Sequence, residues 1–375
     1  MNILCDLILL SWNHLEQTRP CLESLFRTTD VPSRLFIVDN GSEVPVREFL
    51  RAVRPAGAIH DVVLLQNETN EGFPKGMNRG IHASTAPYVC LLNNDLLFTA
   101  GWLSRLLNVA QAHPEIGVLN PISSTFGGYR PTNSAIEEYA KTLQAKRGQY
   151  VEVGMCIGFC MVIKQEVLAC VGALTEEVER IFFEDEDFSM KAQRAGYQCV
   201  TVASSYVYHA EHQTVRKMPE REALFTRNQQ WCNQKWGKRL RVALPRFTPV
   251  QPGSPELRTW LERLIGWARW RSHIYVYCPM PAHVTADELF RSVGLIPHAD
   301  IHWRPIPSLG ARWAATGQIL ARQKKRFDAI VAPEAAWANR MQLFSPLHRA
   351  PVILESNAEE LARLWKGRPL SLSSS

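Results

Sequence analysis

The first half of the 375-residue chain alternates short apolar runs with stretches whose apolar residues recur every three or four positions. The first kind of pattern predicts strands, and the second predicts helices that are covered on one face. The predicted strands span residues 5–10, 34–38, 62–66, 88–92, 116–119, 156–163 and 197–208. The predicted helices span residues 18–26, 46–53, 76–83 and 102–112, with a further helix that opens at the acidic residues 184–187. Such alternation predicts an α/β fold with a mostly parallel sheet covered on both faces.

The second half begins with a proline-rich stretch, after which the same kind of pattern restarts. Residues 241–256 are predicted to be a linker between a domain at 1–240 and a smaller α/β domain at 257–375. Strands are predicted in the smaller domain at 274–278, 299–303, 328–331 and 352–354, with helices at 286–292 and 311–322. In the larger domain, the polar, glycine-containing residues 121–150 are predicted to form a loop or lid.

Composition changes this picture only in placing the chain among ordinary globular proteins. Apolar residues make up 46% of the chain and charged residues 21%, and the net charge is +6 with no long basic block. A positive surface would suit diphosphate-bearing donors, anionic lipid or nucleic acid, so the charge excludes little. We expect no nucleic-acid partner. The nine cysteines form no CxxC pair, which favours reduced thiols and a cytoplasmic location. No apolar run reaches the roughly 18 residues of a membrane-spanning helix, so any membrane contact is expected to be peripheral.

Polar residues follow several predicted strands directly. They are the stretch from Ser11 to Asn13 after the first strand, Asp39 and Asn40 after the second, the stretch from Asn67 to Gly72 after the third, and Asn93, Asn94 and Asp95 after the fourth. One such residue is usually a turn or a helix cap. Four successive strand ends with this character indicate a ligand site, because ligands of parallel α/β sheets bind at the carboxyl ends of the strands.

The stretch 70–80 contains three glycines before and within a predicted helix. Its spacing matches neither GxGxxG nor GxxxxGK[ST], which disfavours a dinucleotide-dependent oxidoreductase and a kinase. The glycines allow a ligand to approach the backbone, and Lys75 and Asn78 offer donors. A glycine-eased loop without a ligand role remains the alternative.

Two further groups carry candidate chemistry. Asp95 and His209, each at the end of a predicted strand, suit Mn²⁺ or Mg²⁺ bridged to a diphosphate, although a lone histidine is more often a surface or core residue. Residues 184–187 are four consecutive acids at a predicted helix start, where acids also stabilise the helix dipole. One carboxylate of this cluster could take the proton of an attacking hydroxyl.

These motifs, in this order, resemble those of family 2 glycosyltransferases. The resemblance covers residues 3–215 and is nearest to the rhamnosyltransferase-like and galactofuranosyltransferase-like branch. It rests on the following stretches: IVDNGS at 37–42, NEGF at 70–73, NRG at 78–80, LNND at 92–95, EDEDF at 184–188 and RAGY at 194–197. The resemblance implies a GT-A nucleotide-sugar-binding fold, an inverting mechanism and a divalent cation.

Carried over position by position, the resemblance makes Asp185 the catalytic base and Asp95 and His209 the ligands of Mn²⁺ or Mg²⁺. Asn93 stands where the family's metal motif commonly begins with Asp. Asp39 would contact the base of the nucleotide. The full set of expected nucleotide-binding residues is Ser11, Asn13, Asp39, Asn70, Gly72, Lys75, Asn78, Asn93 and Asn94.

The expected activity is therefore transfer of a hexosyl or deoxyhexosyl group from a UDP- or dTDP-sugar. The acceptor would be a glycan, a lipid-linked sugar or a protein, in polysaccharide, glycolipid or glycoprotein assembly. A nucleotidyltransferase and an inactive nucleotide-sugar-binding protein are the alternatives. The sequence gives no indication of the oligomeric state.

The segment 255–277 is predicted to contain a helix with apolar residues at helical spacing, two tryptophans among them, and four arginines. Such a helix can lie in a membrane interface, at the inner face of the membrane. Packing of the tryptophans between the two domains is the favoured interpretation.

Overall fold

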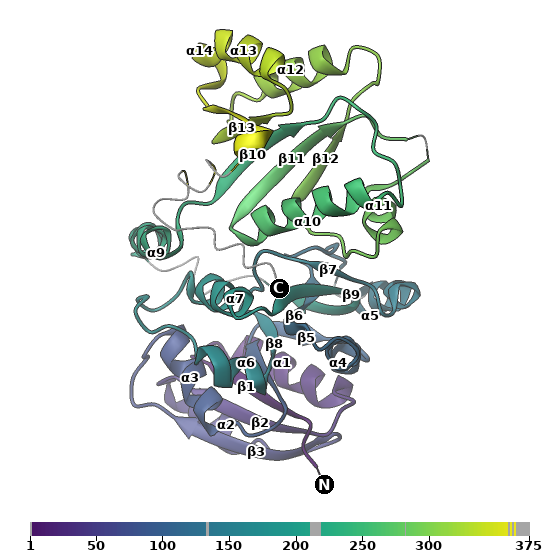
Figure 1. The fold of residues 1–375 in the computed structure, drawn as a ribbon. Coiled ribbons are helices and arrows are strands. Elements are labelled where there is room, and N and C mark those ends of the chain that lie inside the picture. Colours follow the sequence, from purple (N-terminus) through teal and green to yellow (C-terminus); the bar gives the residue numbers. More distant parts are fainter. Residues whose placement is uncertain are drawn as a thin grey trace. The chain divides into compact units, whose positions relative to one another are not determined.

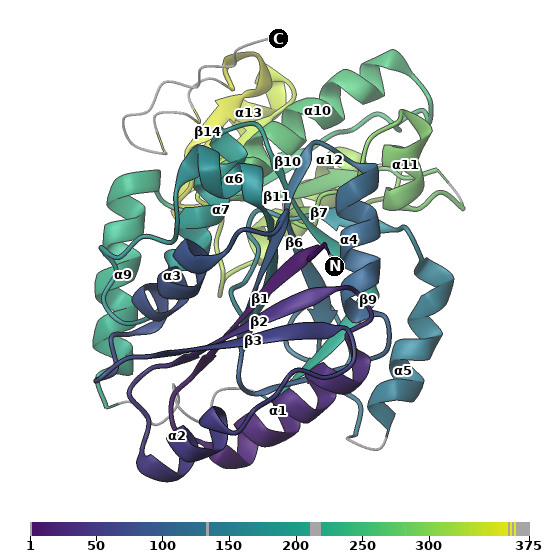
Figure 2. The same cartoon turned by 90° about the horizontal axis from the view of Figure 1, so that it is seen from below.

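The computed structural model describes residues 2–132, 135–210, 219–281, 283–358, 361 and 364. The chain divides into two compact units, Met1–Cys232 and Asn233–Ser375, and each is described by itself. Figure 1 shows the elements of both units, and Figure 2 turns the same ribbon by 90°.

The first unit is built on a mixed sheet that has nine strands in the described residues, in the order β3-β2-β1-β4-β8-β6-β9-β5, with β7 paired to β9. Its strands are β1 (Cys5–Ser11), β2 (Ser33–Asp39), β3 (Ile59–Gln66), β4 (Tyr88–Asn93), β5 (Leu96–Phe98), β6 (Ile116–Ser123), β7 (Tyr150–Glu152), β8 (Cys160–Lys164) and β9 (Gln198–His209). Strands β1 to β4, β6 and β9 run in one direction, while β5, β7 and β8 are antiparallel to their neighbours. Because six strands share a direction, their carboxyl ends meet at one edge of the sheet.

Helices cover this sheet. They are α1 (Leu15–Thr28), α2 (Val44–Arg51), α3 (Phe73–Ala83), α4 (Trp102–Ala112), α5 (Ile136–Thr142), α6 (Gln165–Val171) and α7 (Glu184–Arg194), with the 3-10 helix η2 at Leu143–Lys146. Helices α1 to α4 and α7 lie where the apolar spacing predicts them, whereas α5, α6 and η2 were not predicted. Residues such as Met77 of α3 and Phe188 of α7 pack against Ile8 and Val118 of the strands in one buried cluster. Burial of these apolar surfaces is the main stabilising contribution to the unit, at roughly 25 cal/mol per Å².

The interval 121–150 differs from the predicted loop. Its start completes β6, and α5 and η2 follow. Ile136, Ala140 and Leu143 recur at helical spacing and are buried with Ile122 and Tyr206 in a small cluster. This periodicity is present in the sequence, but the glycines and the proline at 127–131 obscure it. Residues 133 and 134, in the middle of the predicted lid, lie outside the described residues.

The second unit contains a five-stranded sheet in its described part, in the order β12-β11-β10-β13-β14, with all pairs parallel. Its strands are β10 (Leu240–Pro245), β11 (Ser272–Cys278), β12 (Ile301–Pro305), β13 (Ala329–Ala332) and β14 (Val352–Leu354). Its helices are α10 (Pro255–Arg269), α11 (Ala286–Ser292), α12 (Ala311–Ala321), α13 (Ala335–Leu343) and α14 (Ser345–His348), with η3 at Glu355–Asn357. The sheet and the smaller α/β unit predicted from the sequence are thus confirmed.

The structure corrects the prediction that residues 241–256 form a linker between the domains. Within this range, β10 occupies the centre of the second sheet and α10 begins at Pro255, where Ser254 caps the helix through Leu257 N–H. Pro245 ends β10 rather than breaking it, because a proline at a strand end forfeits little of the ladder. The sequence pattern also does not predict α9 (Arg221–Trp236), within which the boundary between the units falls.

Helix α10 packs inside the second unit. Trp260, Leu264 and Trp267 are buried in one cluster with Ile274 and Val276 of β11. The tryptophans therefore belong to the core of this unit, which corrects the expectation that they pack between two domains. Among the described residues, every helix falls short of the length and apolarity needed to cross a bilayer. All nine cysteines are free thiols.

Candidate functional site

Asp95 and His209 meet at the carboxyl edge of the first sheet. Strand β5 pairs with β9 so that Leu96 lies opposite His209, which brings the preceding residue, Asp95, beside the imidazole. The His209 Nε2 and Asp95 Oδ1 atoms are 3.3 Å apart, with side-chain exposures of 2% and 10%. Donors that share one octahedral ion at 2.0–2.1 Å are separated by about 3 Å, so the donor set and its spacing fit a small divalent cation.

The His209 ring is oriented by its neighbours. The Thr125 hydroxyl lies 3.1 Å from Nδ1, and the Phe159 ring stacks on the imidazole at a centroid distance of 5.2 Å. Ser124 accepts a hydrogen bond from the His209 N–H and donates one to its carbonyl. With Nδ1 directed to a hydroxyl, Nε2 is the nitrogen that faces the carboxylate. Such outer partners fix the orientation of a metal-binding histidine.

Asp185 lies in the first turn of α7. Its Oδ2 accepts a hydrogen bond from Gly158 N–H at 3.1 Å, and its Oδ1 accepts one from Glu186 N–H at 2.8 Å. Burial raises the pKa of Asp185 from 3.8 to about 6, although the two backbone hydrogen bonds oppose the shift. A half-buried carboxylate with a pKa near neutrality is suited to accept a proton from a substrate hydroxyl.

The other acids of the cluster have different surroundings. Glu184 and Asp187 are buried, and Asp187 Oδ2 lies 3.7 Å from Lys191 Nζ. Burial, together with the neighbouring charge of Asp185, raises the pKa of Glu184 well above its ordinary value. The Glu184 Oε2 atom is buried without a hydrogen-bond partner in the described residues, which agrees with a protonated carboxyl. Asp185 is therefore the best candidate base of the four.

The approach to α7 is conformationally constrained. Arg180, Phe182 and Phe183 have φ of 58°, 80° and 73°, a left-handed region that bulky residues rarely occupy. Gly72, with φ of 88°, lies so close that an added Cβ would be 2.8 Å from Arg180 Cα. The Phe73 N–H donates to the Arg180 carbonyl at 2.6 Å. Only a glycine allows this contact, which holds the start of α3 against the segment before α7.

Asp185 and His209 line one cavity of about 480 Å³ in the first unit. Asn93 also lines it, so three residues expected from the sequence meet there. The rest of its wall is mostly apolar: Phe73, Thr125, Met155, Ile157, Gly158, Phe159, Ile181, Phe182, Phe183, Glu184, Glu186, Arg221 and Phe225. A largely apolar pocket with a few convergent polar groups is typical of a small-molecule site.

Asp39 is buried at the end of β2, away from the residues that line this cavity. Its Oδ1 accepts from Ser42 N–H at 2.9 Å, its Oδ2 accepts from Gln66 Nε2 at 3.3 Å, and Arg47 Nε is 3.9 Å from Oδ2. At the neighbouring strand ends, Thr18 Oγ1 contacts Ser11 Oγ at 3.3 Å and accepts from Asn94 Nδ2 at 2.9 Å. Ser11, Asp39 and Asn94 thus lie at adjacent strand ends, as the sequence predicts.

Asn40 is one of the polar strand-end residues, but it is not among the nucleotide contacts expected from the sequence. Its buried amide donates to Asn70 Oδ1 at 2.9 Å and to the Gly72 carbonyl at 3.1 Å. Its Oδ1 accepts from Asn67 Nδ2 and from Glu71 N–H. Asn40 therefore holds the glycine-containing loop against the end of β2. The signal was its place beside Asp39, where an amide can both donate and accept.

Three other expected nucleotide contacts have different surroundings. The Asn78 amide donates to Leu174 O at 2.9 Å and to Glu176 Oε1 at 2.8 Å, so it ties α3 to the segment after α6. Asn13 has φ of 55°, and its Oδ1 accepts from Glu43 N–H. Lys75 is exposed and does not line the cavity. The structure does not bring Lys75 and Asn78 together with Asp185 and His209.

Comparison with known proteins gives a family and two relatives. Residues 6–172 match the sequence model of glycosyl transferase family 2. An uncharacterized glycosyltransferase of Haemophilus influenzae is 24% identical over 195 residues, which is 50% of this chain and 60% of the relative. The uncharacterized protein y4gI of Sinorhizobium fredii is 26% identical over 271 residues, which is 66% of this chain and 29% of the relative. The chain thus spans less than two thirds of either relative.

Among solved structures, GalNAc-T7 with UDP, GalNAc and Mn²⁺ aligns with a TM-score of 0.44 and 13% identity. The alignment covers 56% of this chain and 44% of that one. Asp185 and His209 lie beyond the residues matched to the family, so their assignment rests on the geometry described above.

Proposed function

Because residues 6–172 place the chain in glycosyl transferase family 2, we propose that it transfers a sugar from a UDP- or dTDP-sugar to an acceptor hydroxyl with inversion. The observation that carries the proposal is the cavity lined by both Asp185 and His209, with Asp95 at 3.3 Å from the imidazole. A base and a cation-binding pair beside one cavity are the two groups that this reaction requires.

Asp185 would act as the base. The acceptor oxygen attacks the anomeric carbon while its proton passes to the Asp185 carboxylate, and the bond from the anomeric carbon to the diphosphate oxygen breaks. Attack from the side opposite the leaving group inverts the anomeric centre. The hydrogen bonds from Gly158 and Glu186 hold the carboxylate in a fixed orientation during this step.

Asp95 and His209 would hold Mn²⁺ or Mg²⁺. When bound, such an ion neutralises the negative charge that develops on the departing nucleoside diphosphate. The chain supplies an anionic oxygen and an imidazole nitrogen, and the hydroxyl of Thr125 keeps that imidazole in place.

The nucleotide would lie along the ends of β1, β2 and β4. Asp39 can accept the imide N–H of a uracil or thymine, and Ser11 and Asn94 lie at the neighbouring strand ends. Asn40 and Asn70 would act by shaping the loop that ends at Gly72. The aromatic wall of the cavity, Phe182 and Phe225 included, would contact the apolar face of the transferred sugar or of a glycan, lipid-linked or protein acceptor.

A nucleotidyltransferase is the second candidate. It would share the sheet and the cation, but it does not need a general base with a raised pKa beside the cavity. An inactive nucleotide-sugar-binding protein is disfavoured because Asp95, Asp185 and His209 keep hydrogen-bonded or ionic surroundings suited to their roles.

The test is a panel of nucleotide sugars. Each is incubated with the purified chain and Mn²⁺, and both the unfolding midpoint and the release of nucleoside diphosphate are measured. A binding donor raises the midpoint, and slow hydrolysis releases the nucleoside diphosphate without an acceptor. EDTA should abolish the release, and Asp95→Asn should raise the Mn²⁺ concentration needed.

Three outcomes would count against the proposal. Formation of sugar 1-phosphate in place of nucleoside diphosphate, with nucleoside triphosphate appearing when pyrophosphate is added, indicates a nucleotidyltransferase. Stabilisation without any release, with every donor, indicates a binding protein. If EDTA leaves the rate of release unchanged, the reaction does not depend on a cation, because removal of an ion that binds the diphosphate would lower the rate.

A further inference from the structure

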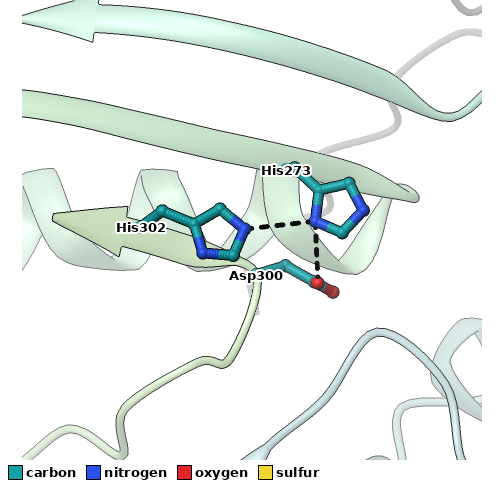
Figure 3. Close-up of side chains that lie close together, drawn as sticks. All are labelled: His273, Asp300 and His302. Carbon is teal, nitrogen blue, oxygen red and sulfur yellow. Dashed lines mark hydrogen bonds and ion pairs between the residues drawn. The ribbon is translucent and has the colours of Figure 1, made fainter. Parts of the chain in front are cut away.

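Three potential metal ligands converge in the second unit. They are His273 near the start of β11, Asp300 directly before β12, and His302 near the start of β12 (Figure 3). His273 Nδ1 lies 3.0 Å from Asp300 Oδ1 and 3.3 Å from His302 Nε2. One ligand atom from each side chain can be chosen such that all three lie within 4.8 Å of one another. In the residues that the structure describes, this is the one such group of three.

The strand register explains why these side chains meet. Strands β11 and β12 are parallel, with Ile274 opposite Ile301 and Tyr275 opposite His302. Residues two apart on a strand point to the same face, and register partners share that face. His273, Asp300 and His302 therefore lie on the face of Tyr275, whose ring is 4.7 Å from that of His302. The opposite face, with Ile274 and Val276, packs against α10.

Hydrogen bonding alone satisfies this group poorly. His273 Nδ1 faces both the Asp300 carboxylate and His302 Nε2, but it can carry only one proton. If that proton points to Asp300, it cannot also make a linear hydrogen bond to His302 Nε2. If His302 Nε2 donates instead, the lone pair of Nδ1 faces a carboxylate oxygen at 3.0 Å. A cation between the three atoms would accept one lone pair from each of them.

The positive charges near this group act against a cation. Arg304 and Arg322 lie close enough to act electrostatically on the His302 imidazole, so they repel a bound ion and limit the affinity.

We propose that His273, Asp300 and His302 form a binding site for a divalent transition-metal ion of the zinc class. Two imidazoles and one carboxylate are ligands that Zn²⁺ accepts, and tetrahedral donors at 2.0–2.1 Å from zinc are about 3.3 Å apart. The separations of His273 Nδ1 from Asp300 Oδ1 and from His302 Nε2, 3.0 and 3.3 Å, are near this value. Three protein ligands leave a fourth position for water.

The site lies at the amino ends of β11 and β12. Catalytic ligands of parallel α/β sheets lie at the opposite edge, so this ion has a structural role. It would join the edge strand β12 to β11 across the half-buried side chains at their starts. The proposal is independent of the glycosyltransferase activity, because none of the three residues belongs to the first unit.

The experiment measures zinc binding by the full chain after removal of metal with a chelator. Zn²⁺ is titrated against a coloured zinc chelator, and Co²⁺ serves as a visible probe of tetrahedral nitrogen and oxygen coordination. His302→Gln and His273→Gln should each weaken binding by at least about tenfold, because one of three ligands is lost. Asp300→Asn keeps the shape of the side chain and should weaken binding as well.

Two controls separate this site from other ligands in the chain. His283→Asn removes an exposed histidine of the same unit and should leave binding unchanged. A variant with both Asp95→Asn and His209→Gln tests whether the first unit accounts for the zinc, and it should retain the ion assigned here. Circular dichroism checks that every variant is folded. If the three ligand variants bind zinc as the wild type does, or if binding disappears only with Asp95 and His209, the proposal is wrong.

Discussion

The two sheets place their polar chemistry at opposite edges. In the first unit, Ser11, Asp39, Asn93 and His209 stand at the carboxyl ends of parallel strands. In the second unit, proline occupies or follows the corresponding ends: Pro245 of β10, Pro279 after β11, Pro305 of β12 and Pro333 after β13. Proline offers neither an N–H nor a side-chain donor. Proline therefore takes strand-end positions in the second sheet at which the first sheet has polar side chains.

The polar group of the second sheet, His273, Asp300 and His302, lies instead at the amino ends of its strands. Parallel sheets bind substrates at the carboxyl edge and use the other edge for stability. Because the polar residues lie at opposite edges of the two sheets, the shared α/β architecture does not make the second unit a copy of the first. We infer catalysis in the first unit and a structural role for the polar cluster of the second.

The largest expected effect comes from Asp185→Asn. The amide keeps the shape of the side chain but cannot accept the acceptor proton, so the transfer rate should fall by at least roughly 10²-fold. Donor binding, measured by thermal stabilisation, should persist. The matched control is Asp287→Asn, the same change at an exposed first-turn acid of α11 in the second unit.

The control should have the wild-type transfer rate. Equal losses in the two variants would contradict the division of roles between the units. Normal turnover in Asp185→Asn alone would assign the base to another acid of residues 184–187.

The pH profile gives a smaller, graded effect. Asp185 must be deprotonated to act as a base, and its pKa is raised to about 6, chiefly by burial. The rate should therefore be constant above pH 7 and fall below pH 6, to roughly a tenth at pH 5. Initial rates at saturating donor and metal measure this limb. An acidic limb that persists unchanged in the residual activity of Asp185→Asn would belong to another group.

Much of the fold could be predicted because buried strands and amphipathic helices leave strong periodic signals. The predicted strands at 5–10, 34–38 and 88–92 match β1, β2 and β4 within one residue. The predicted boundaries were wrong where residues typical of turns lie inside or next to helices and strands. Pro245 suggested a linker but ends β10, and glycines near α5 suggested a loop. Helix α9 has little amphipathic pattern, so periodicity could not find it.

The candidate site was predictable where a residue's position in the sheet decides its place. Asp95 follows β4 and His209 ends β9, both predicted strands, although the short strand β5 that brings the two residues together was not predicted. The hydrogen bonds of Asn40 to Asn70 and of Asn78 to Glu176 were not predicted, because both depend on side-chain contacts between distant segments. The group at His273, Asp300 and His302 was missed for the same reason: only the register of β11 with β12 brings these residues together.

A weaker effect is expected from Thr125→Val, which removes the hydroxyl beside His209 Nδ1 while keeping the side-chain shape. Loss of such a partner typically lowers metal affinity 10- to 100-fold. Because Thr125 is exposed, water can replace the hydroxyl, and we expect about tenfold or less. The activation of transfer by Mn²⁺ gives the apparent affinity.

The control for Thr125→Val is Thr259→Val, at an exposed threonine of α10 in the second unit. It should leave the apparent Mn²⁺ affinity unchanged. A shift of equal size in both variants would show that the measurement reports general stability, and it would remove the argument that Thr125 orients His209.

The smallest expected effect concerns binding of the chain to a membrane surface through α10. Its apolar residues are already buried against β11, and Trp260 and Trp267 are 5% and 6% exposed. Arg258 pairs with Glu262 at 2.9 Å, and Arg263 pairs with Glu355, so part of the basic face is neutralised. Turning this face of α10 toward lipid would expose the apolar residues of β11 that it covers, at a cost of roughly 1.5–3 kcal/mol for each large apolar side chain exposed to water.

We therefore expect no flotation of the chain with anionic vesicles that depends on α10, even at low salt, where electrostatic attraction is strongest. Trp260→Phe with Trp267→Phe keeps the apolar character and should behave as the wild type does. Flotation that is lost in this double variant, with the fold intact by circular dichroism, would show that α10 meets lipid through its tryptophans. The second unit would then have to open its core at the membrane, and the contrast between a catalytic and a structural sheet would fail on the structural side.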